Sequence, residues 1–123
     1  MPIIIKNNSS QDILDIVTTK ILKNDLVSLP TETVYGLAGL GTSLSAAKKI
    51  YKLKKRPLSK KLIFHCSNID MVKKFFILEG ENLLLAEKFW PGPLTLILKR
   101  KSKQIPMSLT KNKYCAVRIP KNL

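Results

Sequence analysis

Residues 89–98 read FWPGPLTLIL, and this stretch decides the fold class. Trp90 and the two prolines of WPGP break the chain sharply, and we expect them to hold a turn against the core. Glu81–Phe89 before the turn has the pattern of a helix, and Leu94–Leu98 after it reads as a strand. Thr95 is the one residue of the stretch for which a role beyond structure stays open. A helix that passes directly into a strand indicates an α/β domain.

The same alternation of strands and helices continues on both sides of this junction. We expect further strands at Pro2–Ile5, Leu26–Leu29, Leu62–Cys66 and Cys115–Ile119, and helices from Ser9 to about Lys23, from Ser43 to about Leu53, and after a cap at Asn68 or Asp70. The pattern contains no internal repeat and no linker. It predicts a single α/β domain, residues 1–123, with a mostly central sheet.

Composition narrows the class of protein further. The chain has 45% hydrophobic residues and only 5 glycines, which is typical of a globular domain. It has no apolar run of membrane-spanning length and no signal peptide, and Cys66 and Cys115 have neither metal nor redox spacing. We therefore expect a soluble, cytoplasmic protein without a membrane partner. The net charge of +14 favours polyanions such as nucleotides, RNA or acidic lipid, although the excess of lysine over arginine also fits an AT-rich genome.

Pro30–Gly36 is the first segment that could carry chemistry. It follows a strand directly, so it should lie at the carboxyl end of that strand, where α/β sheets bind ligands. If the segment is extended, Thr31, Thr33 and Tyr35 project to one side, and their hydroxyls could bind a carboxylate, a phosphate or a polar side chain. The alternative, which this segment alone favours, is a turn whose threonines cap the local backbone.

Lys54–Pro57, which reads KKRP, is the second such segment. The residue before a proline avoids helical geometry, so we expect the helix to end near Leu53 and Lys54 and Arg56 to share one side of an extended chain. A point charge beside a planar guanidinium suits a triphosphate and a carboxylate. The alternative is a solvated basic helix end. Further lysines surround the pair: Lys48, Lys49, Lys52, Lys60 and Lys61.

His65 and Arg118 are the remaining candidates, and each lies in an apolar strand. His65 is the only histidine and points away from Cys66, so these neighbours cannot form a Cys–His pair, and a metal site built on His or Cys is not expected. A single histidine on such a strand is more often a hydrogen-bonded core residue. Arg118 in CAVRIP lies on the face opposite Val117, and burying it is costly unless it meets an acid of the fold or an anionic ligand. The chain has only 8 acidic residues, which favours the ligand.

PTETVYGLA, KKRP with His65 shortly after it, FWPGPLTLIL and AVRIP occur in this order, and together they resemble the YrdC/TsaC family. The resemblance runs from Pro2 onward. It implies a YrdC-like α/β fold with a twisted mixed sheet, flanking helices and a deep basic groove, related to dihydroxybutanone-phosphate synthase. It also implies L-threonylcarbamoyladenylate synthase activity, in which L-threonine, bicarbonate and ATP give threonylcarbamoyl-AMP and pyrophosphate. A tRNA-threonylcarbamoyl transferase complex then modifies tRNA.

The resemblance also implies roles for individual residues. Threonine would be held by Thr33, His65 and Arg118. The ATP phosphates and the carbamate would be held by Lys54, Arg56 and Lys60, of which Lys54 and Arg56 would be catalytic. The pocket would be lined by Thr31 and Tyr35. No metal ligand and no tightly bound cofactor is implied, and ATP would enter as a substrate with magnesium.

The family pattern continues past the arginine strand, through a Ser-x-Asn segment that completes the nucleotide site. This sequence stops at Leu123 without it, so we expect a domain that is incomplete at its C-terminus, with a separate C-terminal fragment as a candidate partner. Two alternatives to the synthase stay open. One is a module that binds tRNA or double-stranded RNA, and the other is an inactive fragment of a split gene.

Overall fold

The structure is a computed structural model that describes residues 11–30 and 35–121. The expected strand Pro2–Ile5, the helix start at Ser9, and Thr31 and Thr33 lie outside the described residues. Within the described ranges, none of the helices combines the length and the hydropathy needed to cross a membrane.

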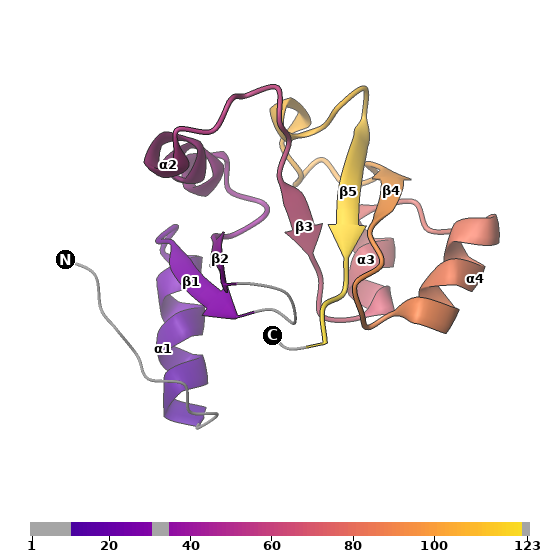
Figure 1. The fold of residues 1–123 in the computed structure, drawn as a ribbon, viewed down its shortest axis with the longest axis horizontal. Helices are drawn as coiled ribbons and strands as arrows, with labels where there is room; N and C mark the ends of the chain where they lie inside the picture. Colours follow the sequence, from indigo (N-terminus) through magenta and orange to yellow (C-terminus); the bar gives the residue numbers. More distant parts are fainter. Residues whose placement is uncertain (1–10, 31–34, 122–123) are drawn as a thin grey trace.

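Helices and strands alternate along the chain, as the sequence predicts (Figure 1). Their order is α1 (Gln11–Leu22), β1 (Val27–Pro30), β2 (Tyr35–Ala38), α2 (Leu44–Lys54), β3 (Ile63–His65), α3 (Ile69–Phe75), α4 (Gly80–Phe89), β4 (Leu96–Lys99), the 3-10 helix η1 (Met107–Leu109) and β5 (Tyr114–Arg118). Strand β2 is not among the strands expected from the sequence, because Pro30–Gly36 by itself favours a turn. Antiparallel pairing with β1, from Val27↔Ala38 to Pro30↔Tyr35, makes it a strand.

The strands of the described residues form two ladders rather than the one central sheet expected from the sequence. One is the two-stranded pair β1-β2, and the other has the order β3-β5-β4. In the larger sheet β5 runs parallel to β3 and antiparallel to β4, so the expected mixed sheet is confirmed. Figure 1 shows α1, β1, β2 and α2 grouped beside the larger sheet, on the side of β3.

One face of the larger sheet forms the core. Its buried residues on the strands are Phe64, Leu96, Leu98, Cys115 and Val117, with Cys66 directly after β3. Val72 of α3, Phe76 at the end of that helix and Ala86 of α4 cover them. Phe64 meets Phe76 edge to face, with ring centroids 5.6 Å apart. The opposite face is open: Ile63 is 52% exposed and Ile97 59% exposed, and Ala116 pairs with both of them.

The WPGP turn packs against this core, as predicted. The Trp90 side chain is buried, and its Nε1–H donates to the carbonyl of Leu94 at 2.7 Å. The Trp90–Pro91 peptide bond is cis. The hydrogen bond between Trp90 and Leu94 closes the turn between α4 and β4, and Thr95 is exposed beyond it.

Candidate functional site

His65 and Arg118 stand opposite each other at the carboxyl ends of the neighbouring parallel strands β3 and β5. Parallel strands bring their carboxyl ends to one edge of a sheet, which is where open α/β sheets bind ligands. Both residues lie on the face away from the core, since Cys66 and Val117 occupy the buried positions next to them. The structure thus brings together two of the three residues expected to hold threonine.

Arg118 is held in place by the WPGP turn. Its side chain is only 8% exposed, and its Nε–H donates to the carbonyl of Gly92 at 2.9 Å. The N–H of Gly92 in turn donates to the carbonyl of Ile119 at 2.8 Å. A buried guanidinium is costly unless it is hydrogen-bonded, so these contacts fix its direction. Sequence reasoning gave WPGP a structural role only and missed that Gly92 orients Arg118.

A hollow of about 370 Å³ opens just beyond the carboxyl ends of these strands. It is lined by Ser67, Asn68, Ile69, Trp90, Pro91, Ile119, Pro120 and Lys121. The side-chain oxygen of Asn68 accepts from the N–H of Met71 at 2.8 Å, so Asn68, one of the two expected caps, is the N-cap of α3. The volume is within the range of small-molecule sites, and the lining combines an indole, short polar groups and a lysine.

The KKRP segment has a different geometry from the expected one. Lys54 is the last residue of α2, and Lys55 adopts a left-handed conformation with φ 52° and ψ 40°. The N–H of Lys55 donates to the carbonyl of Lys52, and that of Arg56 to the carbonyl of Tyr51. The prediction that Lys54 and Arg56 share one side of an extended chain is therefore wrong, because a left-handed cap ends the helix between them. The proline restricts only Arg56.

Arg56 closes the loop that follows α2. Its Nε–H donates to the carbonyl of Lys60 at 2.9 Å, and its Nη2 donates to the carbonyl of Lys61 at 2.8 Å. We call residues 56–61 the basic loop. These two bonds use two of the five N–H donors of a guanidinium. The Lys60 side chain is exposed on the same loop.

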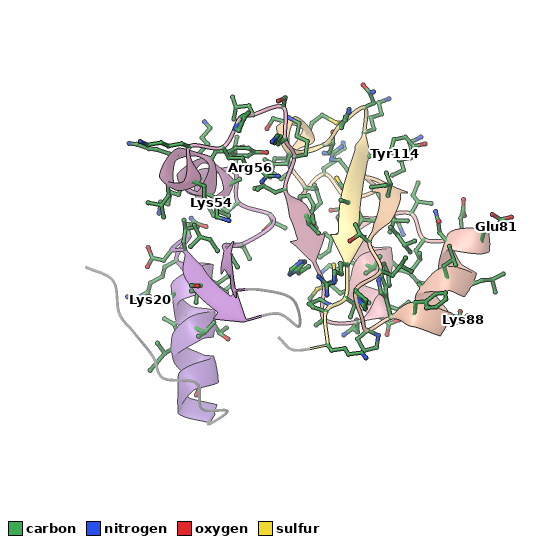
Figure 2. The ribbon with its side chains drawn as sticks, in the orientation of Figure 1. Lys20, Lys54, Arg56, Glu81, Lys88 and Tyr114 are labelled. Carbon is green, nitrogen blue, oxygen red and sulfur yellow. The ribbon has the colours of Figure 1, made fainter. Side chains whose placement is uncertain are left out.

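The two groups of candidate residues lie at opposite ends of β3. Figure 2 places Lys54 and Arg56 beside α2, near the amino end of the strand, whereas His65 and Arg118 lie at its carboxyl end. A strand rises about 3.3 Å per residue, so the three residues of β3 place about 7 Å between its two ends. Tyr35, the expected pocket residue, begins β2 and pairs with Pro30.

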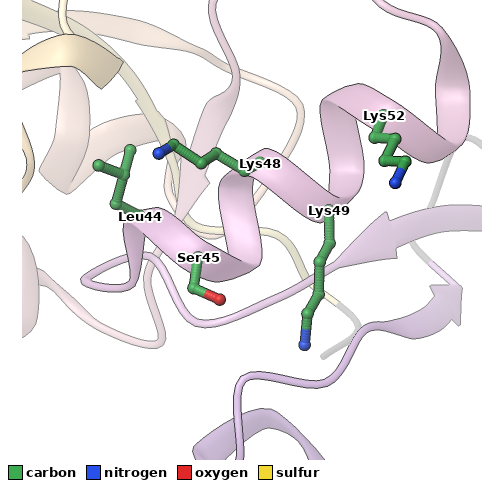
Figure 3. A pocket seen from close by; sticks show the side chains of 5 residues that line it. All are labelled: Leu44, Ser45, Lys48, Lys49 and Lys52. Carbon is green, nitrogen blue, oxygen red and sulfur yellow. The ribbon is translucent and has the colours of Figure 1, made fainter.

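A third basic feature follows one face of α2. Its members are Leu44, Ser45, Lys48, Lys49 and Lys52, which line an open hollow of about 450 Å³ (Figure 3). Lys49 bridges to the turn after α1, since its Nζ donates to the carbonyl of Asn24 at 2.9 Å. We call Lys48, Lys49 and Lys52 the α2 lysine face.

The two cysteine thiols are unreactive. Cys66 and Cys115 are free and buried, and burial raises the pKa of each to about 11, although the charge of Arg100 acts in the opposite direction on Cys115. Thiols with such pKa values are protonated near neutral pH and do not act as nucleophiles. The described part of the chain also contains no cluster of three or more His, Cys, Asp or Glu side chains able to hold a metal ion.

The fold and this site define an α/β domain with cationic side chains at the carboxyl edge of a parallel strand pair and on the loop leading into it. A family model covering Sua5, YciO and YrdC, described as "Telomere recombination", matches residues 19–123. The chain therefore belongs to the Sua5/YciO/YrdC family, and the resemblance stated from the sequence is confirmed.

Individual relatives agree with this assignment. The chain is 40% identical over 104 residues to the threonylcarbamoyl-AMP synthase of Pyrococcus abyssi, covering 81% of this chain and 30% of the relative. It is 38% identical over 100 residues to the Bacillus subtilis enzyme of that name, covering 80% and 29%. The crystal structure of P. abyssi Sua5 complexed with L-threonine superposes with a TM-score of 0.86 at 34% identity, over 94% of this chain and 34% of that one. The chain thus spans about a third of the length of these relatives.

Proposed function

We propose that this chain carries out the chemistry of an L-threonylcarbamoyladenylate synthase, as part of the machinery for tRNA threonylcarbamoyladenosine modification. The amine of L-threonine first attacks the carbon of bicarbonate and water leaves, which gives N-carboxythreonine; this carbamate then reacts with ATP to give threonylcarbamoyl-AMP and pyrophosphate. One observation carries the proposal: the chain superposes on a relative complexed with L-threonine, and it places a histidine and an arginine together at the carboxyl edge of its sheet. A cytoplasmic location is part of this proposal, and the two free thiols support it.

The threonine end of the proposed site is built on His65 and Arg118, with Thr33 as the third residue. Arg118 is tethered through its Nε to the carbonyl of Gly92, so its position is set before the substrate arrives. A guanidinium that is fixed in this way is suited to a carboxylate. Preorganised groups of this kind bind a substrate at a lower cost in conformational entropy.

The phosphate end is built on Lys54, Arg56 and Lys60, and Thr31 and Tyr35 complete the pocket wall. In the proposed reaction the carbamate oxygen of N-carboxythreonine attacks the α-phosphorus of ATP. A new phosphorus–oxygen bond forms while the bond to pyrophosphate breaks. Lys54 and Arg56 stabilise the charge on the oxygens around phosphorus, and the substrate supplies the nucleophile, so the protein needs none.

No tightly bound cofactor is part of the proposal, and ATP is a substrate that brings magnesium with it. The ion would screen charge on the phosphates. The lysines and the arginine of the phosphate end then bind the complex through its remaining negative charge.

Two macromolecular partners belong to the proposal. The tRNA-threonylcarbamoyl transferase complex would receive the adenylate, because the mixed anhydride must pass its acyl group to an amine. A separate C-terminal fragment that carries the Ser-x-Asn segment would complete the domain. The open row of Ile63, Ala116 and Ile97 supports this second partner, since an apolar sheet face of this kind is usually covered.

Pyrophosphate release tests the proposal directly. The chain is assayed alone and together with the Ser-x-Asn part of a relative, and we expect release that needs both threonine and ATP, with threonylcarbamoyl-AMP detected by mass spectrometry. Arg56→Lys should lower the rate at least about ten-fold, because a point charge does not replace the planar fork. The matched control is Arg100→Lys, since Arg100 donates to the carbonyl of Ile105, away from the proposed site. Pyrophosphate release that does not depend on threonine, or no release from the mixture, would favour the alternative that the chain is an inactive fragment of a split gene.

The α2 lysine face favours RNA binding as a second candidate function. Lys48 and Lys52 are exposed along one side of a helix, a geometry that suits the phosphates of tRNA or double-stranded RNA. Replacing Lys48, Lys49 and Lys52 with glutamine should weaken RNA binding at low salt and flatten its salt dependence, with threonine affinity unchanged. Unchanged RNA binding in this variant, measured by fluorescence anisotropy, would remove the candidate.

A further inference from the structure

Tyr51 connects the hydrophobic core with the basic loop. It lies on α2, its ring belongs to the core cluster, and its side chain is 8% exposed. Its hydroxyl donates to the backbone carbonyl of Lys60 at 2.8 Å. A tyrosine in this setting has a rigid ring fixed by packing and a polar tip that acts at the edge of the core.

The Lys60 carbonyl is the point where two contacts meet. It accepts from Tyr51 Oη and from Arg56 Nε at 2.9 Å, which occupies both lone pairs of a carbonyl oxygen. The next carbonyl, that of Lys61, accepts from Arg56 Nη2. The Lys61 side chain extends to the carbonyl of Ser108 at 3.0 Å. The peptide between Lys60 and Lys61 is therefore anchored to the core by Tyr51 and to the start of the loop by Arg56.

We propose that Tyr51 is a positioning residue for the phosphate end of the site. Its hydroxyl holds the Lys60 carbonyl in place. Through that carbonyl it fixes the positions of the Arg56 guanidinium and of the Lys60 side chain, so that both can bind a chain of phosphate groups. The inference rests on the proposed function, because it assigns a role to Tyr51 in that same site. Without the hydroxyl, the loop must be ordered when the ligand binds, and ordering lowers affinity.

The test is Tyr51→Phe in the full chain, titrated calorimetrically with inorganic triphosphate and separately with L-threonine. Both titrations use about 0.3 M salt to screen diffuse lysine binding. The substitution keeps the ring and removes one hydrogen bond, so we expect triphosphate affinity to fall about five-fold. L-threonine affinity should stay unchanged, because His65 and Arg118 lie at the other end of β3. The matched control is Tyr114→Phe, since Tyr114 is 47% exposed, and it should alter neither affinity.

The outcomes separate the inference from the proposed function. An unchanged triphosphate affinity in Tyr51→Phe would overturn the role of Tyr51, and so would an equal loss of both affinities, which would indicate general damage to the fold. A wild-type chain that fails to bind triphosphate even with the Ser-x-Asn part of a relative present would overturn the proposed function itself. Limited trypsin digestion gives a second measurement: cleavage after Lys60 should be faster in Tyr51→Phe than in Tyr114→Phe. Equal cleavage rates would contradict the anchor.

Discussion

Gly92→Ala should uncouple the WPGP turn from the strand that it orients. A Cβ at position 92 would lie 2.7 Å from the carbonyl oxygen of Phe89, a backbone atom at the end of α4, and 3.9 Å from Lys121 Cε. Because the first distance is shorter than real side chains allow and a backbone atom cannot rotate away, the turn must move. This movement distorts two hydrogen bonds of Gly92: its carbonyl accepts one from Arg118, and its N–H donates the other to the carbonyl of Ile119.

The expected magnitude follows from those two contacts. A neutral hydrogen bond contributes about 0.5–1.5 kcal/mol and one to a charged group about 1.5–3 kcal/mol, so weakening both should lower the free energy of unfolding by about 2 kcal/mol. For a chain of this size that corresponds to a fall in Tm of roughly 8 °C. L-threonine affinity should fall about ten-fold, because Arg118 loses the tether that fixes its direction.

The assay pairs thermal unfolding with threonine calorimetry, and Gly80→Ala is the matched control. Gly80 has φ +61° with nothing near its missing Cβ, so alanine there costs stability through backbone strain, about 1–2 kcal/mol. It lies at the other end of the 10-residue α4, about 15 Å from the turn. Gly80→Ala should lower Tm alone, whereas Gly92→Ala should lower Tm and threonine affinity. A wild-type threonine affinity in Gly92→Ala would refute the reasoning.

Two further predictions concern the core. Leu98→Ala should lower the free energy of unfolding in urea by about 2–5 kcal/mol, because Leu98 is 1% exposed. Ile97→Ala, at the neighbouring position on the open face, should change it by no more than about 0.5 kcal/mol. Similar losses in the two variants would contradict the faces assigned to these residues. The thiols of Cys66 and Cys115 have pKa values raised from 9.0 to about 11 in the folded state, so their contribution to stability is complete below about pH 9 and is lost as pH rises through about 11. Replacing both with alanine should reduce this alkaline loss, and an unchanged pH profile would argue against their burial.

Features that depend on short-range chemistry could be predicted from the sequence. The alternation of helices and strands, the Asn68 cap and the packed Trp90 turn each rest on a few neighbouring residues, and all are present. The opposite directions of His65 and Cys66 follow from strand geometry and are also confirmed, since Cys66 is buried and His65 exposed.

Features that depend on distant partners could not be predicted. Strand β2 exists because it pairs with β1, and its own residues read as a turn. The extended geometry predicted for KKRP was wrong, because Lys55 adopts a left-handed conformation that is rare for lysine. Hydrogen bonds of the helix cap stabilise this conformation. The contact between Arg118 and Gly92 joins residues 26 positions apart, and nothing in either local sequence encodes it.

The central claim is that the carboxyl edge of β3 and β5 holds threonine through Arg118. Calorimetric titration of the chain with L-threonine, for the wild type and Arg118→Gln, measures it most directly. A hydrogen bond to a charged group contributes about 1.5–3 kcal/mol, so the variant should bind at least about ten-fold more weakly. Arg100→Gln, which removes an arginine elsewhere, should bind as the wild type does. A wild type that does not bind L-threonine, or an Arg118→Gln variant with full affinity, would contradict the account.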